Sequence, residues 1–112
     1  MNWKNITKQE EIEEIKKVSG TKFTIIFKHS TGCGSSRMSL SRFQKSWKDE
    51  ETTNIEPYFL DLIAYREISN KIAEEFGVKH ESPQLLLIKD GKCIYTASHH
   101  FLDYEELLKH IA

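Results

Sequence analysis

Cysteine offers the most distinctive chemistry in this sequence, which has two of them, Cys33 and Cys93. A cysteine sulfur attacks a disulfide only as the thiolate, so the surroundings of each cysteine decide whether it can react. Cys33 follows a run of small residues and directly precedes a segment with helical periodicity. The unpaired N–H groups and the dipole of a helix N-terminus stabilise an anion. The sequence therefore predicts a Cys33 thiol with a pKa below that of a free cysteine.

Three residues near Cys33 are candidates to assist the sulfur. Gly34 has no Cβ, which lets backbone approach the sulfur closely. Ser36 lies one turn along the expected helix, where its hydroxyl is expected to hydrogen-bond the thiolate. Lys28 would supply positive charge if its side chain turned toward the site. The alternative interpretation of Cys33 is an inert buried thiol that fills a small space.

Alternating helix and strand patterns surround these residues and must position them. Four segments have strand patterns, at residues 22–28, 57–63, 84–89 and 92–97, the last two joined by the hairpin signal Asp90-Gly91. Four segments have helical patterns, beginning at the capping box Thr7-Lys8-Gln9-Glu10, after Cys33, before Ile68 and at Asp103, with Gly20 and Gly77 as C-terminal stops. The order αβαβαββα predicts one α/β domain over residues 1–112, with a mixed sheet of about four strands flanked by helices.

Composition excludes several classes of function. The chain has 112 residues and a formal net charge of −1, so it lacks the electrostatic footprint of a nucleic-acid-binding protein. No apolar run approaches the roughly 18 residues that span a bilayer, so no membrane partner is expected. The start of the chain lacks a signal-peptide pattern, and two cysteines are too few for a disulfide framework. We therefore expect a cytoplasmic protein.

Several segments resemble known redox proteins. Residues 72–78 (IAEEFGV), followed by Ser82-Pro83 and the hairpin, resemble the corresponding part of thioredoxins, and the element order is similar to the thioredoxin-like fold. A closer match is the YtxJ family of monothiol bacilliredoxins (BrxC type), whose signature segments are similar to residues 28–33 (KHSTGC), 78–84 (VKHESPQ) and 97–99 (ASH). Bacilliredoxins are glutaredoxin-like proteins that reduce mixed disulfides between protein thiols and bacillithiol.

The resemblance implies a monothiol mechanism. Ser36 stands where dithiol enzymes have their resolving cysteine, and serine cannot form a disulfide, so an outside thiol must release Cys33. Thioredoxins carry a buried carboxylate six residues before the active cysteine, whereas this chain has Phe27 there. The implied partners are S-thiolated proteins, with bacillithiol or another low-molecular-weight thiol as co-substrate and a flavin-dependent disulfide reductase to recycle it. No bound cofactor is expected.

The fold also implies a substrate rim. Thr31, Gly34 and Ser35 are expected to contact the substrate beside Cys33. A cis bond is expected between Ser82 and Pro83, where the Ser82 backbone would pair with an extended substrate.

Ser98, His99 and His100 precede the last helix, where glutaredoxins bind a carboxylate of the small thiol. Backbone N–H groups at a helix start suit an anion. These residues are therefore expected to hold the malate carboxylates of bacillithiol. Two solvated loop histidines are the alternative.

Cys93 is not expected to resolve Cys33. It follows the hairpin turn, which about five strand residues of about 3.3 Å each place roughly 15–20 Å from Pro83. A disulfide requires Cα atoms within about 7 Å of each other. Cys93 is therefore expected to fill a strand position.

One departure from the family leaves other functions open. Cys33-Gly34-Ser35-Ser36 replaces the usual Cys-Pro-Ile-Ser, and a Cys-Gly pair is similar to monothiol glutaredoxins that carry iron–sulfur clusters. A cluster carrier and a non-catalytic interaction or stress module are therefore the alternatives to a disulfide oxidoreductase. No ligand spacing around His29, His80 and Cys33 specifies a metal site.

Overall fold

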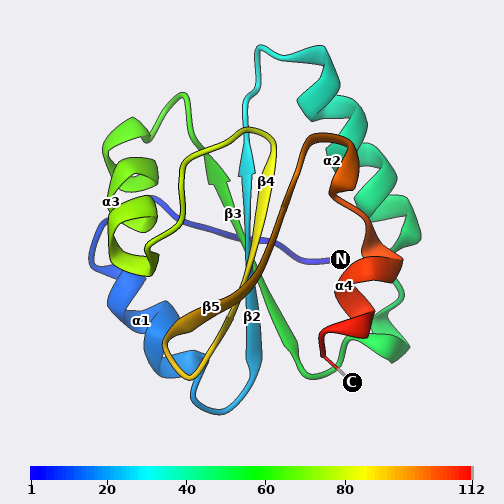
Figure 1. The fold of residues 1–112 in the computed structure, drawn as a ribbon, viewed down its shortest axis with the longest axis horizontal. Helices are drawn as coiled ribbons and strands as arrows, with labels where there is room; N and C mark the ends of the chain where they lie inside the picture. Colours follow the sequence, from blue (N-terminus) through cyan, green and yellow to red (C-terminus); the bar gives the residue numbers. More distant parts are fainter. Residues whose placement is uncertain (112) are drawn as a thin grey trace.

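A five-stranded mixed sheet in the order β1-β3-β2-β4-β5 forms the centre of the computed structural model, which describes residues 1–111 (Figure 1). The strands are β1 (Lys4–Asn5), β2 (Phe23–His29), β3 (Ile55–Asp61), β4 (Gln84–Lys89) and β5 (Lys92–Ser98). The helices are α1 (Glu11–Val18), α2 (Gly34–Ser46), α3 (Arg66–Phe76) and α4 (Tyr104–Lys109), with short 3₁₀ turns η1 (Asp49–Glu51) and η2 (His99–Phe101).

Strand directions follow from the connections. β1, β2 and β3 are parallel because helical crossovers link them, whereas β4 runs antiparallel to both β2 and β5. The four strands expected from the sequence are present: β4 has the expected ends, and the ends of the other three differ by at most two residues. β1 was not expected, because two exposed residues carry no hydrophobic pattern.

Helices cover both faces of the sheet: α1 and α3 lie on one side and α2 and α4 on the other (Figure 1). Side chains alternate along β2, so Ile26 packs in the core beneath α1 and α3, and Phe27 packs in the core beneath α2 and α4. The second core is rich in aromatic rings, and Trp3, Trp47 and Phe43 pack within it. Phe27, which stands where thioredoxins have a carboxylate, thus makes an apolar contact between the sheet and Phe43 of α2.

Helix ends show one difference from the prediction. The capping box at Thr7 does not form, because the Thr7 N–H and hydroxyl both reach the Glu11 carboxylate, at 3.4 and 3.3 Å, and α1 begins at Glu11. The other signals hold. Gly77 ends α3 in the left-handed conformation, with φ of 64°, and the Asp103 carboxylate accepts the Glu106 N–H at 3.2 Å to cap α4. Among residues 1–111, no helix has the length and apolar character needed to cross a membrane.

Candidate active site

Cys33 lies at the junction between β2 and α2, at the carboxyl end of the central parallel strands. It is the N-cap residue of α2, with extended backbone angles (φ −106°, ψ 122°), and its carbonyl accepts the Arg37 N–H at 3.1 Å to begin the helix. Its own N–H donates to the Ser30 carbonyl at 3.2 Å. This turn leaves the side chain partly exposed at the start of the helix.

Hydrogen-bond donors converge on the Cys33 sulfur. Ser35 Oγ lies 3.1 Å from Cys33 Sγ. This hydroxyl is the main reason why the pKa of Cys33 is lowered, followed by the backbone N–H groups of Ser36 and Ser35. Partial burial opposes the shift, and the positive charge of Arg37 adds a smaller contribution in the same direction as the donors. The lowered pKa predicted from the sequence is confirmed.

Ser36 does not use its hydroxyl as expected. The side chain is fully buried, its Oγ lies 2.9 Å from His29 Nδ1, and it accepts the Ser30 N–H at 3.1 Å. Ser36 reaches the sulfur only through its backbone N–H, because its side chain points back toward the end of β2. The prediction for this hydroxyl was wrong, and Ser35 supplies the hydroxyl instead.

Lys28 also differs from the expectation. It follows Phe27 on β2 and therefore faces the opposite side of the sheet from α2. Its side chain is fully buried, and Nζ donates to the Ser69 carbonyl of α3 at 3.2 Å. Burial lowers the pKa of Lys28 to about 8 from 10.5. The structure therefore does not bring this amine to the Cys33 sulfur.

Arg37 is the cation near Cys33 that the sequence interpretation missed. Its Nη1 donates to the Thr31 carbonyl at 3.1 Å, across the turn that holds the cysteine. Thr31 is thereby placed beside the site through its backbone. The spacing was a usable signal, since a residue four positions after a helix N-cap lies one turn along the same face.

A hollow of about 280 Å³ adjoins this turn, and several expected rim residues line it. The lining residues come from α2, from the start of β4 and from η2: Ser35, Met38, Ser39, Arg42, Pro83, His99 and His100. The Ser82–Pro83 peptide bond is cis, as expected. The Pro83 carbonyl accepts the His99 N–H at 3.1 Å, which fixes η2 beside the proline. Ser35, Pro83 and His99 are thus brought together next to Cys33.

Two expected rim residues are used differently. The Ser98 hydroxyl donates to the Glu81 carboxylate, and Ser98 does not line the hollow. The Ser82 hydroxyl is buried without a hydrogen-bond partner in residues 1–111, so only its backbone can serve a substrate. The start of α4 is capped by the Asp103 carboxylate, which accepts the Glu106 N–H, one of the N–H groups that were expected to receive an anion. The Arg42 guanidinium, which lines the hollow, is a second group able to bind an anion, whereas His99 Nε2 lies 3.6 Å from the Glu81 carboxylate.

Cys93 lies in β5 near the hairpin, paired in register with Ile88 at the far end of β4 from Pro83. Both cysteines are free. Burial raises the pKa of Cys93, and its Sγ contacts the Tyr95 carbonyl at 3.5 Å. Cys93 therefore occupies a strand position, as expected, and its environment disfavours the thiolate.

Other polar groups do not form a metal site. His29 is bonded to Ser36, and His80 Nδ1 lies 3.3 Å from Ser69 Oγ. Across the described part of the chain, no three His, Cys, Asp or Glu side chains cluster closely enough to hold a metal ion.

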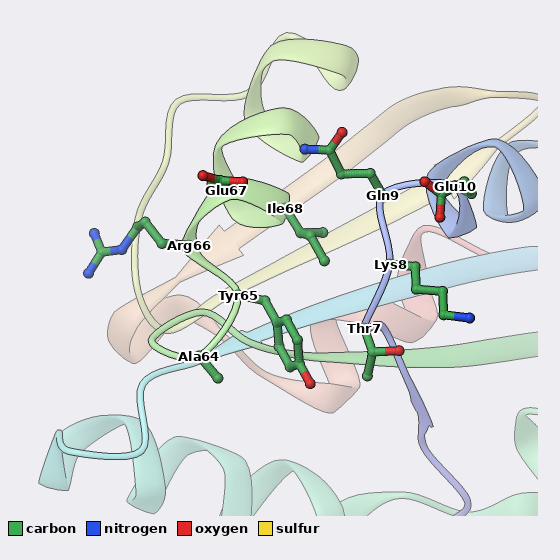
Figure 2. Close-up of a pocket in the computed structure, with 9 residues that line it drawn as sticks. All are labelled: Thr7, Lys8, Gln9, Glu10, Ala64, Tyr65, Arg66, Glu67 and Ile68. Carbon is green, nitrogen blue, oxygen red and sulfur yellow. The ribbon is translucent and has the colours of Figure 1, made fainter.

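A larger hollow of about 550 Å³ lies elsewhere, between residues 7–10 and the start of α3 (Figure 2). Tyr65 and Ile68 point toward the N-terminal segment in this view, and Arg66 points away. None of the residues expected to act in catalysis lines it.

Solved structures with similar folds match the chain over nearly its full length. A putative oxidoreductase with a thioredoxin fold has a TM-score of 0.81 at 23% identity, and the match covers 96% of this chain and 92% of that one. A thioredoxin of Malassezia sympodialis (Mala s 13) has a TM-score of 0.73 at 22% identity, covering 98% and 88%. A thioredoxin of Fasciola hepatica has a TM-score of 0.69 at 17% identity, covering 96% and 95%. These likenesses show the thioredoxin fold.

The family follows from the sequence match. The family model described as monothiol bacilliredoxin BrxC matches residues 4–107, a range that includes Cys33, the cis Pro83 and His99. This match and the thioredoxin fold together support a thiol oxidoreductase. The chain belongs to the monothiol bacilliredoxin BrxC family.

Proposed function

We propose that this protein removes bacillithiol from protein mixed disulfides through Cys33. The observation that carries the proposal is the set of donors at the Cys33 sulfur: the Ser35 hydroxyl at 3.1 Å and the N–H groups of Ser35 and Ser36, which lower the pKa of the thiol. The thiolate is the attacking species in disulfide exchange, so a lowered pKa increases the share of Cys33 that can attack.

The first step transfers the small thiol. The Cys33 thiolate attacks the bacillithiol sulfur of the mixed disulfide, and a Cys33–bacillithiol disulfide forms as the protein–bacillithiol S–S bond breaks. The protein cysteine leaves as a thiolate and takes a proton from water. No net oxidation occurs, because one disulfide replaces another.

The second step needs an outside thiol. Ser36, three residues after Cys33, cannot form a disulfide, and Cys93 lies at the other end of the β4–β5 hairpin. A second bacillithiol thiolate therefore attacks the bacillithiol sulfur on Cys33, releases bacillithiol disulfide and restores the Cys33 thiolate. A flavin-dependent disulfide reductase would reduce that product. This cycle suits the cytoplasm, where small thiols are kept reduced.

The hollow beside Cys33 suits an acidic small thiol. Arg42, His99 and His100 line it together with Pro83 and Ser35. Its volume of about 280 Å³ leaves room for part of a small thiol. The two malate carboxylates of bacillithiol would lie against Arg42 and the histidines, while the Ser82 backbone pairs with the extended protein substrate.

Intact-mass spectrometry tests the transfer. Protein with Cys93→Ala is mixed with a bacillithiolated substrate protein, and a Cys33→Ser variant serves as the control. The expected result is a single bacillithiol adduct on Cys33, released by further bacillithiol, with no adduct on the control. Absence of the adduct would reject this function, and a coloured protein after anaerobic reconstitution with iron, sulfide and thiol would then support the cluster-carrier alternative.

A further inference from the structure

The charged side chains of α2, the helix that leads away from Cys33, are all positively charged. The helix contains Arg37, Arg42 and Lys45 and no aspartate or glutamate, although the whole chain has a net charge of −1. Within residues 1–111, no salt bridge joins any of these three cations to an acidic side chain. Their charge is therefore available to a partner.

The surface of α2 is hollowed as well as charged. A second hollow, of about 450 Å³, is lined by Met38, Ser41, Arg42, Lys45 and Ser46. It shares Met38 and Arg42 with the hollow beside Cys33, so the two hollows adjoin along α2, and we call them together the α2 groove.

One exposed apolar side chain lines the α2 groove, and another lies on the neighbouring turn η2. Met38 is 71% exposed and lines both hollows. Phe101, which is 69% exposed, belongs to η2, and η2 contacts α2. Two of the four large hydrophobic side chains that are exposed in residues 1–111 thus lie on these two adjoining elements. A basic groove with apolar contacts is typical of a surface that binds a peptide rather than only a small ion.

The length of the α2 groove indicates what fills it. Ser46 lies eleven helical positions after Ser35, a rise of about 16 Å, which matches about five residues of extended chain. A small thiol bound at Cys33 fills only the hollow beside Cys33. The second hollow, at Ser41 and Lys45, can be reached from Cys33 only by a longer chain attached to the reacting disulfide.

We infer that the α2 groove docks an acidic segment of the S-thiolated protein, next to the cysteine that carries the small thiol. The inference rests on the proposed function and adds the kind of protein that is favoured. Arg42 and Lys45 attract the acidic side chains, and Met38 contacts an apolar residue of the segment. The Cys33 end holds the disulfide, so acidic residues within about five positions of the modified cysteine fit best.

Synthetic peptides with one bacillithiolated cysteine test this inference. Two peptides differ only in having three aspartates or three lysines on one side of that cysteine. The rate of bacillithiol transfer to Cys33, expressed as kcat/KM, is expected to be higher for the acidic peptide and to lose this advantage as salt is raised. Lys45→Glu, outside the hollow beside Cys33, is expected to reduce kcat/KM for the acidic peptide about two- to fivefold.

Lys17→Glu is the matched control. Lys17 and Lys45 are exposed lysines in the last turn of a helix, so both substitutions make the same change in net charge and in helix-end charge. Only Lys45→Glu is expected to change the preference between peptides. Equal rates for the two peptides, or equal effects of the two substitutions, would overturn the inference.

A binding measurement separates this inference from the chemistry. Fluorescence anisotropy of labelled peptides, with serine in place of the cysteine, reports docking without any disulfide. Tighter binding of the acidic peptide, weakened by Lys45→Glu and not by Lys17→Glu, supports the α2 groove even if transfer fails. Transfer at equal rates with no difference in binding rejects the α2 groove and leaves the proposed function intact.

Discussion

His29 Nδ1 and Ser36 Oγ lie 2.9 Å apart, and this hydrogen bond joins the last residue of β2 to the first turn of α2. The Ser30 N–H completes the arrangement by donating to the same hydroxyl at 3.1 Å. Burial lowers the pKa of His29, which favours the uncharged ring, and Nδ1 of that ring can accept a hydrogen bond from the serine hydroxyl. The bond ties the first turn of α2 to the end of β2, on either side of Cys33. In this arrangement the N–H groups of Ser35 and Ser36 point toward the Cys33 sulfur.

The two serines after Cys33 are expected to differ in their effect on its reactivity. Ser35→Ala removes the hydroxyl 3.1 Å from the sulfur, which is the largest contribution to the lowered pKa, so the Cys33 pKa should rise. Ser36→Ala leaves both N–H groups in place and should move the pKa less. The pH dependence of iodoacetamide alkylation, measured in a Cys93→Ala background, gives both midpoints. An equal shift in the two variants would contradict this assignment.

Stability should show the opposite ranking. Ser36→Ala leaves the buried His29 Nδ1 and the partly buried Ser30 N–H without their partner, and an unsatisfied buried polar group costs about 1–3 kcal/mol. Ser35 is exposed, so Ser35→Ala should change the free energy of unfolding by less than about 0.5 kcal/mol. Urea denaturation of both variants tests this ranking. A Ser36→Ala protein as stable as the parent would show that water replaces the hydroxyl.

Acid should destabilise the protein through His29 and His80. Burial is the main cause that lowers both pKa values from 6.5, so the unfolded chain binds protons before the folded one does. The stability that these two histidines contribute is therefore fully present above pH 6.5 and is lost as the pH falls below it. Urea midpoints between pH 5 and 7.5 should show this fall, and a His29→Asn variant should show a smaller one. An unchanged pH dependence in the variant would assign the effect to other groups.

Lys28 gives a stability effect on the alkaline side. Its pKa is about 8 in the folded protein and 10.5 when unperturbed, so between these values the unfolded chain holds a proton that the folded chain has lost. Stability contributed by this group therefore rises with pH across that window, by at most about 1.4 kcal/mol per pH unit.

Lys28→Met isolates that contribution. The variant keeps a long apolar side chain in the buried position and removes the titration. The free energy of unfolding of the parent, minus that of the variant, should therefore rise from pH 8 to 10. Tyr58 and Tyr104 act in the opposite direction, since burial raises their pKa to about 12, but they are common to both proteins and cancel. A constant difference across this range would mean that Lys28 keeps its proton in the folded protein as it does in the unfolded chain, so that folding does not lower its pKa.

Most of the fold could be predicted because its signals are local. Gly77, Asp103 and the Asp90-Gly91 turn each act through their own backbone conformation or hydrogen bonds, and each is found where it was expected. The start of α1 was misplaced because Thr7 bonds to the carboxylate of Glu11 and does not form the expected capping box with Glu10. Nearby carboxylates compete for Thr7, and the sequence does not show which of them binds it. β1 depends on pairing with β3, which no local pattern shows.

The site was predicted less completely because its contacts depend on side-chain direction. The position of Cys33 and the cis bond before Pro83 followed from motifs and the fold. The orientation of Ser36 depends on His29, and that of Lys28 depends on which face of β2 meets α3. A sequence gives the order of these residues along the chain, but side-chain packing decides which hydrogen-bond partner each polar group takes.

The aromatic core under α2 provides a built-in optical signal. The two tryptophans of the chain, Trp3 and Trp47, both pack against Phe43 of α2, with ring centroids 6.3 and 5.8 Å apart. Intrinsic fluorescence therefore reports on the helix that carries the reactive sulfur at its start. A disulfide on Cys33 that displaces α2 would change the emission, so turnover could be followed in real time without a label.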